Sequence, residues 1–234
     1  MADLAAVAGR ASAAAAGALV IGGTLAVAAA VAAGPGTGLA GYVSEAGTST
    51  YPLAGTYRAG VLAIAAGLAV LGGAAAPLSA LGAALLGVAA VAAAVSGAVP
   101  CTDRCPLPPF EAATGADLVH GGASIVGVAA CVFAMLALAA TPAARATPAV
   151  GPAVRRLALV GAGVTLPLSG AMGLAMLFAG RGTVTGAVER ALLLAAATWV
   201  VATATLLVRA GGSPATRTTL EHAQPTASTW RNDR

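Results

Sequence analysis

The residues best suited to chemistry lie in one short polar segment, VPCTDRCPLPPF, at positions 99–110. Cys101 and Cys105 are four positions apart, close enough for a disulfide across a tight turn. Catalytic redox pairs usually have the spacing C-x-x-C, which this segment lacks. A structural disulfide is therefore the favoured interpretation, while a redox pair, free thiols and a metal site stay open.

His120 follows this segment and could join the two cysteines as a third zinc ligand. Zinc needs four protein ligands, or three and an open position, and the chain has only two histidines, so no metal or cofactor is expected. His120 could instead act as acid or base with Glu45 or Glu189, as in a hydrolase or transferase. That enzyme hypothesis lacks a strong nucleophile, because Ser44 and Ser124 are weak candidates.

The composition indicates a lipid environment. Apolar residues make up 59% of the 234 positions, and charged residues make up 9%, against about 25% in soluble domains. So little charge cannot cover the surface of a soluble protein of this size. All 12 cations are arginine, scattered along the chain with one adjacent pair, Arg155-Arg156, and without interleaved aromatic residues, so we expect membrane lipid and no nucleic acid as a partner.

Long uncharged stretches predict an all-α bundle of six transmembrane helices, because a span needs about 20 apolar residues. Residues 59–99 carry no charge and would reach about 60 Å as one helix, twice the hydrocarbon core, so they form two. The expected spans are 11–33, 59–75, 78–99, 118–140, 157–179 and 190–208. They make one domain, residues 1–209, and we expect the Thr-, Ser- and Pro-rich tail at 210–234 to be disordered and cytoplasmic.

The first span has an alternative interpretation as a secretory signal peptide. It follows a lone Arg10 and contains AVAAA at 26–30, which fits an A-x-A cleavage site. Its apolar stretch is longer than the roughly 7–15 residues of a signal core, which favours a retained helix. Cleavage would leave five helices in the same orientation.

Arginine positions predict the orientation of the helices, because cytoplasmic loops are rich in Arg. With the N-terminus inside, the cytoplasmic side carries Arg10, Arg145, Arg155, Arg156, Arg209, Arg217, Arg231 and Arg234, and the outer side Arg58, Arg104, Arg181 and Arg190. Six spans return the C-terminus to the cytoplasm, as expected for a multi-pass protein of the cytoplasmic membrane. The cysteine segment then lies on the oxidising side, where disulfides persist.

Polar residues near the outer helix ends are expected to form one cluster, made of Ser44, Glu45, Arg58, His120, Glu189 and Arg190. An unpaired carboxylate near the hydrocarbon boundary is costly to desolvate. We therefore expect Glu45 or Glu189 within about 4 Å of Arg58, Arg190 or His120. The alternative is that each charge points separately into water or headgroups.

Two stripes of polar and small residues share helical spacing on different spans. The first stripe is His120, Ser124, Gly127 and Cys131, and the second is Thr165, Ser169, Met172 and Met176. They could face each other and line a shallow cleft. The simpler interpretation is ordinary helix packing, since small and hydroxyl side chains also join membrane helices.

Four motifs together resemble a known family: YVSEAGT after the first span, VPCTDRCP after the third, LVH at the fourth and ER at the sixth. The chain resembles, over roughly residues 12–209, the prokaryotic six-helix membrane family catalogued as domain of unknown function 998. Ala46-Gly47 stands where that family often has Leu-Gly. The resemblance marks Ser44, Glu45, Cys101, Cys105, His120, Glu189 and Arg190. It implies no activity.

The leading functional hypothesis is a non-enzymatic membrane component. Its small polar site would open to the outer face and bind a lipid headgroup, a small solute or a protein partner. The alternatives are the hydrolase or transferase described above and a small-solute transporter. The sequence shows no repeat of two halves and no charge at the middle of a span, which disfavours the transporter.

Overall fold

The computed structural model describes residues 2–34, 38–141 and 150–210, and over these ranges the chain is helical without strands. The long helices are α1 (Ala2–Ala32), α2 (Ala54–Ala75), α3 (Ala80–Ala98), α4 (Gly115–Ala140), α6 (Gly151–Phe178) and α7 (Thr183–Ala210), and a short 3-10 helix, η1, covers Val43–Gly47. All six long helices are long and apolar enough to cross a membrane. The predicted all-α, six-helix, multi-pass membrane class is therefore confirmed, while the tail at 211–234 lies outside the described residues.

Five helices begin several residues before the start expected from the sequence. The expected spans began at or just after a charged residue, but the helices carry such residues within their first eight positions: Arg58 in α2, Asp117 in α4, and Glu189 and Arg190 in α7. An uncharged stretch marks the apolar part of a helix, but it does not include the helical turns that carry charged residues. Only α3 begins later than expected, because the Ser79 side chain caps it by accepting a hydrogen bond from the amide of Gly82.

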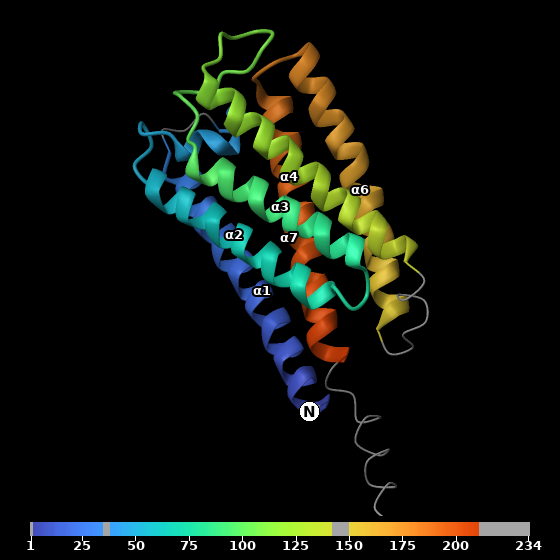
Figure 1. The fold of residues 1–234 in the computed structure, drawn as a ribbon. Coiled ribbons are helices and arrows are strands. Elements are labelled where there is room, and N and C mark those ends of the chain that lie inside the picture. Colours follow the sequence, from blue (N-terminus) through green and yellow to red (C-terminus); the bar gives the residue numbers. More distant parts are fainter. Residues whose placement is uncertain (1, 35–37, 142–149, 211–234) are drawn as a thin grey trace, which may run out of the picture.

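The helices form a ring in chain order (Figure 1). Each helix packs against its neighbours in sequence, and α1 packs against α7 to close the ring. Residues 38–53, 99–114 and 179–182 connect helices at one end of this ring, which we call the polar end. The start of α1 and the end of α7 lie together at the opposite end.

The half of the ring near the opposite end has a close-packed core. Leu71, Leu86, Met135 and Leu138, from α2, α3 and α4, are fully buried there. Along the wall of the ring, α1 and α2 touch through glycines, since a Cβ added at Gly60 would lie 2.7 Å from the carbonyl oxygen of Gly23. Small residues allow this close approach of membrane helices.

Helix α6 packs against its neighbours in the ring, α4 and α7, along only part of its length. Its buried residues are Gly151, Val154, Ala158, Ala162 and Thr165, all of which precede Pro167. No residue from 166 to 178 is buried. Pro167 has no amide hydrogen for the i−4 carbonyl, which weakens the helix at this point. The second half of α6 is therefore only loosely packed against the other helices.

Candidate functional site

A cavity of about 630 Å³ lies inside the ring. All six long helices line it, from Tyr57 to Leu68 on α2, and from Glu189 to Val200 on α7. An 11-residue helical advance corresponds to about 16 Å, roughly half of the hydrocarbon core. The cavity thus extends from the polar end to about the middle of the bundle.

The cavity wall is polar at one end and apolar beyond it. The polar and sulfur-bearing residues nearest the polar end are Tyr42, Ser44, Ser96, Cys101, Cys105, Asp117, His120, Ser124, Glu189 and Arg190. Deeper positions are mainly aliphatic, as at Val20, Leu68 and Val200. Ile125 and Leu194 line the cavity and are also 59% and 58% exposed. Because both lie well inside their helices, the cavity opens sideways at membrane depth.

An ion pair joins η1 to the connection between α6 and α7. Arg181 donates from Nε to Oε1 of Glu45 at 2.6 Å and from Nη2 to Oε2 at 2.8 Å. The Glu45 carboxylate is nearly inaccessible and also accepts a hydrogen bond from the amide of Tyr42 at 2.9 Å. These contacts with Glu45 raise the pKa of Arg181, which therefore stays charged. The pair fixes two loops of the polar end to each other.

The first turns of α7 hold the loop that follows α1. Glu189 Oε2 accepts a hydrogen bond from the amide of Val43 at 2.8 Å. Arg190 donates to three carbonyl oxygens, those of Gly38, Gly41 and Gly186. Within the described ranges, no hydrogen bond engages the second carboxylate oxygen of Glu189, although this residue lines the cavity.

Asp117 ties the cysteine loop to the start of α4. It forms a capping box with Thr114, and it also accepts hydrogen bonds from the amide and hydroxyl groups of Thr102. Arg104 and Cys105 have φ values of 66° and 48°, in the left-handed region that non-glycine residues rarely adopt. The contacts of Asp117 with both ends of this loop help to maintain that conformation.

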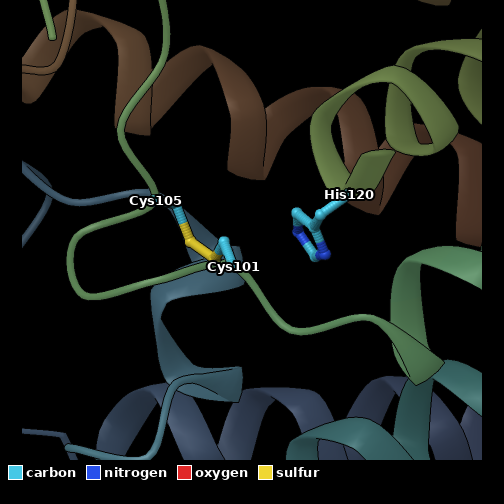
Figure 2. Close-up of side chains that lie close together, drawn as sticks. All are labelled: Cys101, Cys105 and His120. Carbon is cyan, nitrogen blue, oxygen red and sulfur yellow. A yellow bond between two sulfur atoms is a disulfide. The ribbon is translucent and has the colours of Figure 1, made fainter. Parts of the chain in front are cut away.

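Cys101 and Cys105 form the favoured disulfide, and His120 lies beside them (Figure 2). A ligand-type atom from each of the three residues lies within 4.8 Å of the other two, and all three residues are buried. Nδ1 of His120 lies 2.9 Å from the carbonyl oxygens of both Ser96 and Val99. Nε2 is buried and has no hydrogen-bond partner among the described residues.

The six residues expected in one polar cluster separate into two groups. Ser44, His120, Glu189 and Arg190 line the cavity. Glu45 and Arg58 lie outside its lining, and Arg58 donates to the carbonyl oxygens of Gly97 and Ala98. The salt bridge found in the described ranges pairs Glu45 with Arg181, a cation outside the expected set.

The geometry bears on two earlier hypotheses: the acid–base pair of a hydrolase or transferase, and the cleft between the two polar stripes. In the described part of the chain, no hydrogen bond joins His120 to Glu45 or Glu189, so no acid–base pair is formed there. Seven of the eight stripe residues line the cavity, as the cleft hypothesis requires. The exception is Thr165, which donates to the carbonyl oxygen of Gly161.

The roles of Arg181 and Asp117 in joining the loops of the polar end were not expected from the sequence. Asp117 carries a local signal, because T-x-x-D before an apolar run at 114–117 is a capping box. Arg181 carries no comparable signal, since its partner lies 136 positions away.

Residues 13–206 match the family described as "Protein of unknown function (DUF998)". No curated protein and no solved structure matches the chain. The match covers well over half of the sequence and includes all residues that line the cavity. This six-helix membrane protein therefore belongs to the DUF998 family.

Proposed function

We propose that this protein binds a membrane amphiphile in the cavity of the ring and performs no chemistry on it. One observation carries the proposal: the cavity is polar at one end, apolar along the remainder and open toward lipid at membrane depth. Its volume lies within the roughly 300–1,000 Å³ typical of small-molecule sites. A lipid satisfies both parts of the wall, with its headgroup at the polar end and its chain beside the aliphatic residues.

The charges at the polar end indicate the chemistry of the headgroup. Asp117 and Arg190 are occupied by hydrogen bonds to the chain itself. Glu189 keeps one carboxylate oxygen uncommitted within the described ranges. A carboxylate accepts hydrogen bonds, so the preferred headgroup carries an amine or hydroxyl donor.

We infer that the polar end faces away from the cytoplasm. Eight of the 12 arginines lie near the start of α1, at or after the end of α7, or in or next to the α4–α6 connection along the sequence, and the positive-inside rule assigns these segments to the cytoplasm. The disulfide between Cys101 and Cys105 agrees, since disulfides persist outside the cytoplasm. Reporter proteins fused at Arg145 and after Ala210 should be active only if they are of a kind that works in the cytoplasm. Activity of an extracytoplasmic reporter at either position would contradict this orientation.

Lipid binding is tested by mass spectrometry of the protein extracted in mild detergent. We expect one retained lipid per chain, rich in amine or hydroxyl headgroups. Ala197→Phe places a bulky side chain at the cavity wall and should reduce this retention at least about tenfold. The matched control is Val160→Phe on α6, where the residue is 63% exposed and lies outside the lining of the cavity.

A separate variant, at Glu189, tests which headgroup the cavity prefers. Glu189→Gln keeps an oxygen to accept the hydrogen bond from Val43 and replaces the free carboxylate oxygen by an NH₂ donor, so it should shift the retained lipids away from amines. Absence of any lipid at fixed stoichiometry, or equal retention by the Ala197→Phe and Val160→Phe proteins, would refute the binding function.

A further inference from the structure

Three ligand-type groups meet at the polar end of the cavity, and the proposed lipid site does not depend on their metal-binding chemistry. The sulfur atoms of Cys101 and Cys105 and a ring nitrogen of His120 lie within 4.8 Å of one another. Two thiolates and an imidazole are the donors that zinc prefers. The presence of only two histidines in the chain disfavours a closed four-ligand zinc site, but three ligands suffice where a fourth position is open.

The environment of His120 determines which ring nitrogen is free. Nδ1 faces two carbonyl oxygens at 2.9 Å, and carbonyls only accept hydrogen bonds, so Nδ1 carries the proton. The lone pair of the neutral ring is then on Nε2, which is buried without a partner among the described residues. Metal-binding histidines characteristically donate their other N–H to a carbonyl oxygen in this way.

We propose that Cys101, Cys105 and His120 form a redox-controlled zinc site. With the disulfide closed, the sulfur atoms are bonded to each other and the site cannot hold a metal. With the disulfide reduced, two thiolates and Nε2 of His120 bind one Zn²⁺ ion. The proposal goes beyond lipid binding and does not depend on it.

The reduction requires an external dithiol. That dithiol supplies two electrons and two protons, its own sulfur atoms form a disulfide, and Cys101 and Cys105 become free thiols. Zn²⁺ then displaces both thiol protons as it binds. Ligands of tetrahedral zinc lie about 3.5–3.8 Å apart. Once the sulfur–sulfur bond of about 2.0 Å is broken, the two sulfur atoms must therefore separate by about 1.7 Å. The ring nitrogen already lies within 4.8 Å of both.

Two further contacts suit a metal site. Ser44 Oγ lies 3.5 Å from Sγ of Cys105 and can donate a hydrogen bond to its thiolate. All three ligands line the cavity, so a fourth position on the metal is accessible to water or to a bound headgroup. Figure 2 shows the imidazole beside the cysteine pair, with the loop of 101–105 folded on the other side.

Zinc titration of the full chain tests the site. The protein is purified in detergent through a tag without histidine, and its zinc affinity is measured anaerobically against a chelating dye, before and after phosphine reduction. The reduced protein should bind one Zn²⁺ per chain, at least about tenfold more tightly than the oxidised protein. Cobalt in place of zinc should give a thiolate-to-metal charge-transfer absorption, which reports the sulfur ligands without any substitution.

Matched variants separate ligation from folding. His120→Asn retains an N–H donor near the two carbonyls but removes Nε2, and should weaken zinc binding by more than about tenfold. Cys101→Ser with Cys105→Ser should abolish it, while Cys131→Ser, at the third cysteine, should leave it unchanged. The site is disproved if the reduced protein takes up no zinc, if cobalt gives no charge-transfer absorption, or if a folded His120→Asn protein binds zinc as tightly as the wild type.

Discussion

The two halves of the ring are stabilised in different ways. Near the opposite end, Leu71, Leu86 and Leu138 fill the centre and leave little room for anything else. Near the polar end the centre is hollow, and the surrounding loops are held by polar contacts such as the pair between Glu45 and Arg181. The comparison shows that a hollow interior can be maintained where hydrogen bonds connect the loops around it.

The largest effect is expected at the polar end, from Arg181→Ala. This change leaves the Glu45 carboxylate buried without its cation, which costs about 3–5 kcal/mol of unfolding free energy. SDS titration in mixed micelles measures the loss. The unfolding free energy of Arg181→Lys should lie between those of the wild type and Arg181→Ala, because a lysine keeps the charge but cannot make both hydrogen bonds of the guanidinium.

A double variant tests whether the unpaired charge causes that loss. Combining Glu45→Gln with Arg181→Ala removes the buried charge as well as its partner, and should be less destabilising than Arg181→Ala alone. If Arg181→Ala costs less than about 1 kcal/mol, the polar end does not depend on this pair.

Two matched leucine truncations compare the halves directly. Leu138→Ala, in the packed half, should cost about 2–5 kcal/mol, because the change opens a cavity in a dense core. Leu192→Ala should cost about 2 kcal/mol or less, since this buried leucine lines space that is already empty. Equal losses in the same SDS titration would mean that the two halves are equally packed.

The smallest effect concerns the wall of the ring between α1 and α2. Gly60→Ala brings a Cβ against the carbonyl oxygen of Gly23 and should cost about 1–3 kcal/mol. The control, Gly73→Ala on the same helix, meets no atom within 4 Å and should be neutral or stabilising by up to about 1 kcal/mol. If Gly60→Ala leaves the unfolding free energy unchanged, α1 and α2 can move apart enough to admit the methyl group without loss of stability.

The six helices could be predicted because the bilayer imposes a length and a hydropathy that any spanning segment must have. Their starts could not, since charged residues such as Arg58 and Glu189 continue the helices beyond the apolar runs. The partner of Glu45 was not predictable either, because four arginines were available on the outer side and tertiary packing selected Arg181. The stripe containing His120 and Cys131 allowed a cleft, but ordinary helix packing was the simpler interpretation, because small and hydroxyl side chains fit both. The sequence provides no measure of how much space remains between the helices.

The order of the helices around the ring also bears on biogenesis. Five of its six contacts join helices that are consecutive in the chain, so these can form while the protein is being synthesised. The contact between α1 and α7 joins the first and last described helices, so, like the contact between α6 and α7, it must wait for the final helix. Until then, the cavity lacks the side that α7 supplies, from Glu189 to Val200, and cannot enclose a ligand.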